Sequence, residues 1–190
     1  NRYQYPSRLP RRVQRRMIDA ATRVMNRTGY DDAPFNMEFF WNRSADQLAL
    51  LEVNARCSKS HSPIFHMVDG ASHFQVMVNL GLGEAPSFPH RQGDYRMAAK
   101  FMLRVFEPGR ISRVPSKADL DRLQGRFPEA CVRVLVESGQ NLATLRFQDS
   151  YSYELAEVFL GGHDQAELLA RAREAREILD FRVDHAQRAA

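Results

Sequence analysis

Two segments in the first third of the chain alternate large apolar residues with polar ones. They span residues 35–41 and 48–56, and a polar stretch at residues 42–46 separates them. Short runs of aromatic and branched residues on either side of a polar turn are typical of two antiparallel strands. We therefore predict a β-hairpin that folds about Ala45.

The predicted register divides the hairpin side chains between two faces, because successive residues of a strand point to opposite sides. It pairs like residues with like: Glu38 with Glu52, Phe40 with Leu50, and Asn36 with Asn54. The apolar face holds Phe35, Met37, Phe39, Trp41, Ala49, Leu51 and Val53. The polar face holds Asn36, Glu38, Glu52, Asn54 and Arg56.

The polar face places two carboxylates, Glu38 and Glu52, directly opposite each other. Side chains in such a pair have Cβ atoms about 5 Å apart, and like charges there destabilise a sheet. One interpretation is a solvated surface that tolerates the repulsion. The other is a divalent cation between the carboxylates, since Mg²⁺ favours one or two carboxylates together with phosphate oxygens. Asn54 adds a neutral oxygen ligand on this face, and Arg56 suits a phosphate or carboxylate.

This arrangement, Glu38 followed by Glu-Val-Asn-Ala-Arg at residues 52–56, resembles the metal-binding signature of the ATP-grasp superfamily. There the last hairpin of the nucleotide domain carries a Glu and then Glu-x-Asn-x-Arg. The resemblance extends over nearly the whole chain but matches only the back half of a complete enzyme. It is strongest to the L-amino-acid ligases, and biotin carboxylases and carbamoyl-phosphate synthases share the layout. Members activate a carboxylate as an acyl phosphate and pass it to an amine or similar nucleophile.

The resemblance implies a role for each polar residue of the hairpin. Glu38, Glu52 and Asn54 would hold Mg²⁺ or Mn²⁺ at the phosphates of ATP. Arg56 would be catalytic because it stabilises the acyl phosphate.

The resemblance also implies two further parts of the site. Phe40 and Leu50, farther along the polar face, would form part of an apolar shelf for adenine. A polar loop beyond the metal ligands would face the substrate and the γ-phosphate; it contains Ser58, Lys59, Ser60 and His61. The alternative for this loop is a solvated turn before a helix.

Periodicity predicts the remaining elements. Apolar residues at helical spacing predict a helix over residues 11–28 that Gly29 ends, and a short buried helix over residues 70–82. From residue 95 the pattern shifts toward strands. We expect strands at 97–106, 111–114, 131–136, 153–160 and 181–183, and helices at 117–124 and 164–179 that Ser116 and Asp164 cap.

We therefore expect an α+β architecture with an antiparallel sheet and packed helices. Residues 1–84 would be the C-terminal portion of an ATP-grasp nucleotide- and metal-binding domain, and residues 85–94 a linker. Residues 95–184 would form a small, mixed, β-rich subdomain, and residues 185–190 a frayed tail.

The composition of the chain limits the classes of partner that we expect for it. The 190 residues are 44% hydrophobic and 26% charged, as in ordinary globular proteins. The net charge of +4 comes largely from arginines before residue 28. No nucleic-acid motif occurs, and no aromatic residue lies among the arginines from Arg8 to Arg27, so we expect no nucleic-acid partner. No run approaches the ~20 apolar residues of a membrane span. Cys57 and Cys131 lack metal-motif spacing, which favours reduced thiols in a cytoplasmic protein.

The function that the resemblance implies is ATP-dependent carboxylate–amine ligation of small molecules, by an enzyme for which a homodimer is left open. One alternative is a biotin carboxylase or carbamoyl-phosphate synthase-like enzyme on the same scaffold. The other is a non-catalytic remnant that binds a metal or a partner, because no glycine-rich phosphate loop occurs and the only lysines are Lys59, Lys100 and Lys117. We expect a fragment that lacks the N-terminal half of the site and is inactive alone.

Overall fold

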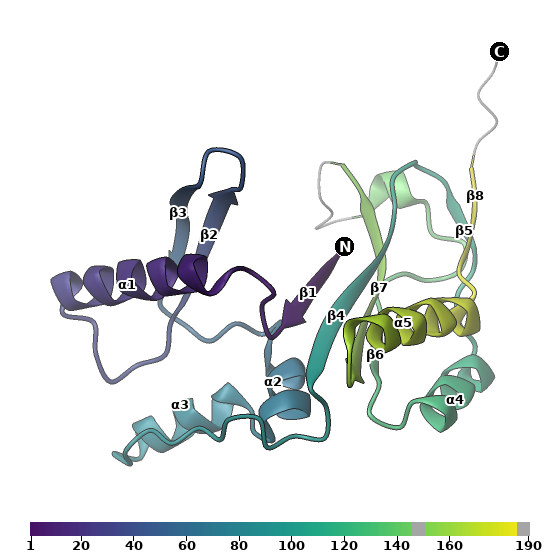
Figure 1. Ribbon diagram of the computed structural model, residues 1–190. Coiled ribbons are helices and arrows are strands. Elements are labelled where there is room, and N and C mark those ends of the chain that lie inside the picture. Colours follow the sequence, from purple (N-terminus) through teal and green to yellow (C-terminus); the bar gives the residue numbers. More distant parts are fainter. Residues whose placement is uncertain (146–150, 186–190) are drawn as a thin grey trace.

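The computed structural model describes residues 1–145 and 151–185, and its centre is a four-stranded antiparallel sheet (Figure 1). The strands lie in the order β1, β4, β7, β6, so the first strand of the chain pairs with one that begins almost a hundred residues later. Their bounds are β1 Arg2–Tyr5, β4 Met97–Val105, β6 Cys131–Val134 and β7 Tyr153–Gly162.

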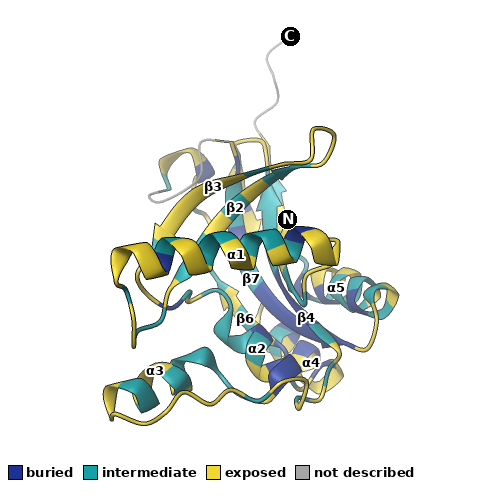
Figure 2. Ribbon diagram, turned by 60° about the vertical axis from the view of Figure 1, so that its left-hand side comes forward, coloured by how far each residue is buried: buried dark blue, intermediate teal, exposed yellow. Residues whose placement is uncertain are grey.

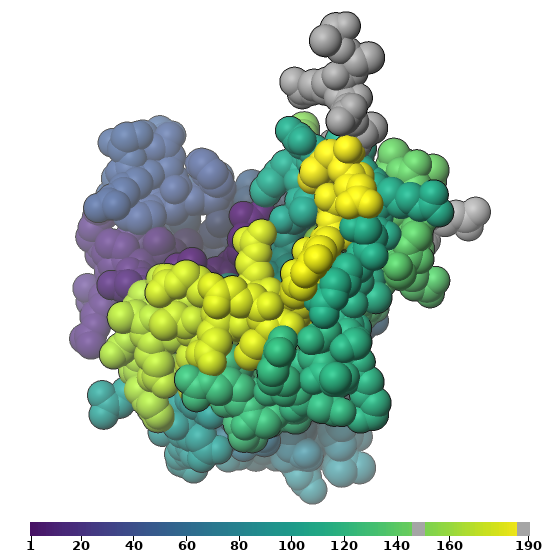
Figure 3. Space-filling view, turned by 90° about the vertical axis from the view of Figure 1, so that its right-hand side faces the viewer, coloured from purple at the N-terminus to yellow at the C-terminus, as the bar shows by residue number. Residues whose placement is uncertain are grey.

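Helices cover both faces of this sheet. Ala98 of β4 and Phe159 of β7 pack against α2 (Ser62–Asp69). The neighbouring residues Ala99 and Leu160 point to the opposite face and pack against α4 (Lys117–Arg126) and α5 (Gln165–Leu179). Figure 3 shows α5 and α4 together over that face. The sheet is buried on both sides, which explains why β4 and β7 are almost continuously apolar.

Local signals in the sequence fix the ends of the helices. The Ser116 side chain accepts the backbone N–H of Asp119, whose carboxylate accepts the N–H of Ser116 in return, so α4 begins with a capping box. Asp164 caps α5 through the N–H of Glu167. Gly29 ends α1 (Arg11–Thr28) in the left-handed conformation that glycine adopts without strain.

A smaller ribbon adjoins the sheet at the C-terminal end of the chain. It pairs β5 (Arg110–Arg113) with β8 (Arg182–Asp184). Together with a 3₁₀ turn at Leu142–Thr144 it encloses a separate small core. The core residues are Ile111, Val136, Leu142 and Leu155.

The N-terminal part of the chain is far more exposed than the central sheet (Figure 2). The hairpin of β2 (Asn36–Asn42) and β3 (Gln47–Asn54) stands beside α1 and apart from the sheet (Figure 1). None of its residues is fully buried, and those of α1 are buried only at Val13 and Met25. The remaining helix, α3 (His73–Gly81), follows α2.

These elements confirm most of the sequence predictions, including the bounds of α1. The helix predicted over residues 70–82 is shorter and begins at His73, because Ser72 caps it through the N–H of Phe74. The expectation that it is buried was wrong: no residue of α3 is buried. The first 84 residues share a sheet with the later ones through β1, and the division into domains stays a prediction. The frayed tail predicted for 185–190 lies outside the described residues from 186 on.

The hairpin register is confirmed at its open end and wrong near its turn. Asn36 pairs with Asn54 and Glu38 with Glu52, as predicted. A β-bulge then shifts the pairing, so that Phe39 lies opposite Leu50 and Phe40 opposite Ala49. The extra residue of the bulge is Leu51 on β3, and it interrupts the regular alternation on which the predicted register relied.

Candidate functional site

The open end of the hairpin forms one wall of a cavity of about 830 Å³, which we call the polar cavity. The loop after β3 and the β1 strand complete its walls. The structure brings eight of the ten predicted site residues to this cavity: Glu38, Glu52, Asn54, Arg56, Ser58, Lys59, Ser60 and His61. Hairpin pairing therefore gathers residues from two strands and a loop around one space, as the sequence predicted.

Glu38 and Glu52 are directly paired across the two strands, and both side chains are exposed. No cationic side chain in the described part of the chain forms an ion pair with either carboxylate. Two adjacent carboxylates on paired strand positions repel each other. A cation placed between them would remove this repulsion.

Three polar residues beside the carboxylates are held in place by hydrogen bonds. The Asn36 Nδ2 donates to the backbone oxygen of Arg56 at 3.0 Å, and the Asn54 Nδ2 donates to the Asn36 Oδ1 at 3.3 Å. Because Asn54 uses its nitrogen in this bond, its Oδ1 remains available as a ligand. The Arg56 guanidinium donates to the oxygen of Cys57 at 3.3 Å and is otherwise exposed at the cavity wall.

His61 lies at the end of the loop, where it precedes the first turn of α2. Its ring meets the Tyr3 ring edge-on at 5.6 Å between centroids. Burial lowers the pKa of His61, and the neighbouring His73 and Lys100 lower it further. The imidazole is therefore neutral near pH 7 and able to accept a proton.

Lys100 lies next to this site and was not predicted from the sequence. It lies on β4, on the face that carries Ala98, and its Nζ is 3.4 Å from the Ser60 Oγ and 2.5 Å from the Glu157 Oε1. The Nζ also lies 5.9 Å from the centre of the Tyr3 ring. The available signal was one of two charged residues in the otherwise apolar run of β4, Lys100 and Arg104, since buried charges are rare unless they are paired.

Phe40 and Leu50 do not come together at the polar cavity. Phe40 shares the strand face of Glu38 but lies beyond it, is 57% exposed and does not line that cavity. The bulge turns Leu50 to the other face, where it lines a separate space of about 600 Å³ with Phe39 and Val24 of α1. The expectation that they share one face was wrong, and their roles toward adenine stay a prediction.

The available ligands suit magnesium better than zinc. No group of three His, Cys, Asp or Glu side chains suited to a metal ion occurs in residues 1–145 and 151–185. Structural zinc sites use four nitrogen or sulfur ligands. Mg²⁺ instead takes one or two carboxylates and fills its other positions with water and phosphate oxygens. Glu38, Glu52 and the Asn54 amide oxygen fit that second pattern.

Comparison with known proteins confirms the resemblance to the ATP-grasp superfamily. Residues 5–87 match the family described as carbamoyl-phosphate synthase L chain, ATP binding domain. This match includes the whole hairpin and the loop that follows it. Over this segment the chain therefore resembles ATP-grasp proteins, and its fold is that of ATP-grasp ligases.

Individual relatives are distant and longer. The urea amidolyase of Saccharomyces cerevisiae is 25% identical over 177 residues, which cover 89% of this chain and 9% of that protein. The L-amino acid ligase of Bacillus licheniformis superimposes with a TM-score of 0.72 at 18% identity, over 97% of this chain and 44% of the ligase. A third similar structure is the biotin carboxylase domain dimer of Hydrogenobacter thermophilus 2-oxoglutarate carboxylase, which was solved with MgADP and bicarbonate. It superimposes with a TM-score of 0.60 at 17% identity, over 96% of this chain and 39% of that chain.

The chain thus spans less than half the length of each of these three proteins. None of the helices that the structure describes is long and apolar enough to cross a membrane.

Proposed function

We propose that this chain is the C-terminal part of an ATP-dependent carboxylate–amine ligase that works through an acyl phosphate. The observation that carries the proposal is the direct pairing of Glu38 and Glu52, without cationic partners among the described residues, at a cavity that Asn54 and Arg56 also line. Such a site suits a metal-bound triphosphate. In this proposal the upstream half of the enzyme supplies the opposite wall.

Each residue of the cavity has a distinct task in this reaction. Glu38, Glu52 and Asn54 would hold Mg²⁺, which neutralises phosphate charge when it is bound. Arg56, exposed at the wall, would orient the phosphoryl group with its planar fork of donors. Neutral His61, at the end of the loop, would accept the proton that the attacking amine loses. Lys100 lies outside the cavity lining, and its ion pair with Glu157 and its contact with Ser60 would hold the loop in position.

A carboxylase is the second candidate, and the comparisons favour it directly. The sequence match is to a carbamoyl-phosphate synthase segment, and one relative is a urea amidolyase. In such an enzyme the activated acid would be bicarbonate. The two candidates separate by substrate: bicarbonate-dependent phosphate release supports the carboxylase, and release that requires a larger carboxylate together with an amine supports the ligase. One neighbour was solved as a dimer, and a homodimer of this protein is also a proposal.

The decisive experiment measures metal binding in the full-length polypeptide with bound ATP. Glu38→Gln and Glu52→Gln each remove a charged ligand, so we expect at least about ten-fold weaker Mn²⁺ binding by paramagnetic relaxation. Glu84→Gln is the matched control, because Glu84 is an exposed acid that lies in the loop after α3. Unchanged Mn²⁺ affinity in both hairpin variants would refute the metal site and with it the proposed function.

A further inference from the structure

A second cavity, of about 390 Å³, adjoins the polar cavity and has a different character. The two cavities share Asn36, Ser58 and His61. The other walls of the second cavity are largely aromatic and aliphatic: they include Phe35, Cys57, Phe65, His73, Val76 and Phe88. We call this space the aromatic cavity.

No formally charged side chain lines the aromatic cavity. Its three titratable groups also favour their neutral forms. Burial raises the pKa of the Cys57 thiol. Burial is likewise the main cause that lowers the pKa values of His61 and His73. A charged ligand group would lose its hydration here without gaining an ionic partner, so the cavity suits an uncharged group.

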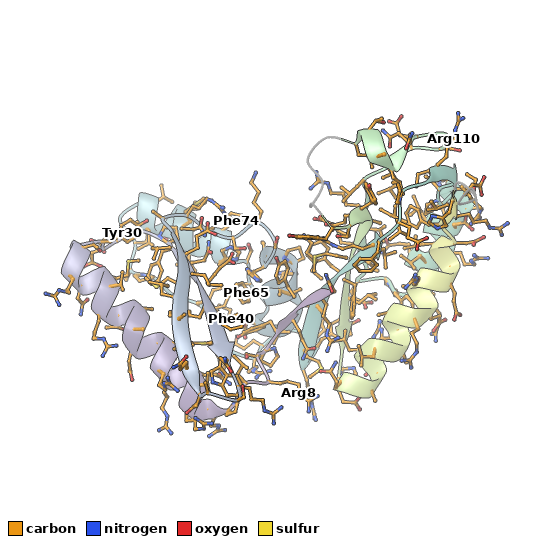
Figure 4. The ribbon with its side chains drawn as sticks, turned by 90° about the horizontal axis from the view of Figure 1, so that it is seen from above. Arg8, Tyr30, Phe40, Phe65, Phe74 and Arg110 are labelled. Atoms are coloured by element: carbon orange, nitrogen blue, oxygen red, sulfur yellow. The ribbon has the colours of Figure 1, made fainter. Side chains whose placement is uncertain are left out.

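The arrangement of the rings favours an aromatic occupant. Phe65 projects from α2 (Figure 4) and meets two other rings of the cavity wall edge-on. Its centroid lies 5.2 Å from that of His73 at an interplanar angle of 89°, and 6.1 Å from that of Phe88 at 79°. Edge-to-face contacts of this kind extend readily to one more ring.

The size of the cavity agrees with such an occupant. A protein cavity of about 150 Å³ that is lined by apolar side chains binds benzene. The aromatic cavity, at about 390 Å³, therefore has room for a ring and the carbon that attaches it to a larger molecule.

We propose that the aromatic cavity is a specificity subsite for a bulky apolar side chain, preferably an aromatic one, on an amino acid substrate. The charged end of that substrate lies in the polar cavity, and the side chain passes Asn36, Ser58 and His61 to enter the aromatic cavity. The assignment of the substrate as an amino acid rests on the proposed ligase function. The apolar subsite itself rests on the walls described above.

The test uses ¹⁹F NMR with 4-fluoro-L-phenylalanine as the probe and the full-length polypeptide. Val76→Phe fills the cavity from α3, and we expect it to weaken probe binding at least about ten-fold. Val78→Phe is the matched control, because Val78 lies on the same helix, is 50% exposed and does not line the cavity. Phe88→Ala provides a second variant in a loop, where folding is less at risk, and it should weaken binding about five-fold through the lost ring contact.

A parallel assay separates this proposal from the proposed function. With Mg-ATP and an amine, phosphate release should favour L-phenylalanine over L-alanine in the wild type, and Val76→Phe should abolish that preference. If the probe binds as expected but no amino acid stimulates phosphate release, the subsite stands and the ligase function fails. Absent probe binding in the wild type, or equal binding in the wild type, Val76→Phe and Phe88→Ala, overturns the subsite even if the enzyme turns over.

Discussion

At the scale of single residues, the two glutamates of the polar cavity differ from the nearby Lys100 in whether their charges are paired. Glu38 and Glu52 face each other without a cation from the described part of the chain. Lys100 shows the opposite arrangement. Its Nζ lies 2.5 Å from the Glu157 Oε1 on the central sheet, and both side chains are largely buried. A buried charge with a bonded partner is fixed in position, whereas the exposed glutamates keep their full capacity for an external cation.

Arg56 carries the first prediction at this scale. Arg56→Lys in the full-length polypeptide keeps the charge but removes the planar fork of donors, so we expect kcat to fall at least about ten-fold while the apparent KM for ATP changes less. Steady-state kinetics with Mg-ATP measure both constants. Arg43→Lys, in the exposed hairpin turn, is the control. A variant that loses only thermal stability would show that Arg56 has a structural role instead.

At the scale of elements, the bulge in β3 decides what the hairpin presents on each side. Leu51 is the extra residue, and its insertion places Leu50 opposite Phe39. Leu50 then faces the space beside α1 that Val24 also lines, while Phe40 stays on the face of the glutamates. The hairpin thereby separates a packing face from a ligand face within a few residues.

This separation predicts different consequences for two similar substitutions. Leu50→Ala should lower the melting temperature by about 2–4 °C and leave the KM for ATP unchanged, because Leu50 lies on the side of the hairpin that faces α1. Phe40→Ala should raise the KM for ATP about ten-fold without a comparable change in melting temperature, because an exposed ring on the ligand face is free to stack on adenine. Calorimetry and kinetics on both variants check this. The reverse pattern would mean that Leu50 and not Phe40 meets the nucleotide.

At the scale of the whole molecule, stability and function lie in different regions. The central sheet has helices on both faces and holds most of the buried apolar residues. The hairpin is exposed on its apolar side, with Leu51 63% and Val53 42% accessible (Figure 2). Exposed apolar surface next to ligand residues is characteristic of an interface with a further part of a protein.

We therefore predict that the 190-residue chain by itself folds but has neither ligase nor ATPase activity. Its two helix-backed cores should give cooperative unfolding by circular dichroism. Mg-ATP would meet a half-site open to water, where charge interactions are about four-fold weaker than in a partly enclosed site. Titration of Mg-ATP into the purified chain, with phosphate release monitored, measures this. Micromolar binding with turnover would contradict it and show that no further wall is needed.

Local patterns in the sequence predicted the helices and strands and most of the candidate site. Period-two alternation and a polar turn defined the hairpin, and the opposed pairs Asn36–Asn54 and Glu38–Glu52 followed from strand geometry alone. Capping residues such as Ser116 and Asp164 marked helix starts, because their side chains bond to backbone groups only a few residues away. These features depend on contacts between residues that are close in the chain or lie across a single turn, so the local sequence pattern is sufficient to predict them.

Contacts between distant parts of the chain determine which further residues lie at the site. Tyr3 lines the polar cavity, and Lys100, its partner in the pairing of β1 with β4, contacts Ser60 of the cavity wall; no local pattern encodes either contact. The bulge at Leu51 could not be predicted from the pattern either. The apolar run of β3 looks regular with or without one extra residue, but that residue moves Leu50 to the other face of the hairpin. The aromatic cavity likewise requires α2, α3 and the hairpin to meet, and packing between separate elements determines its shape.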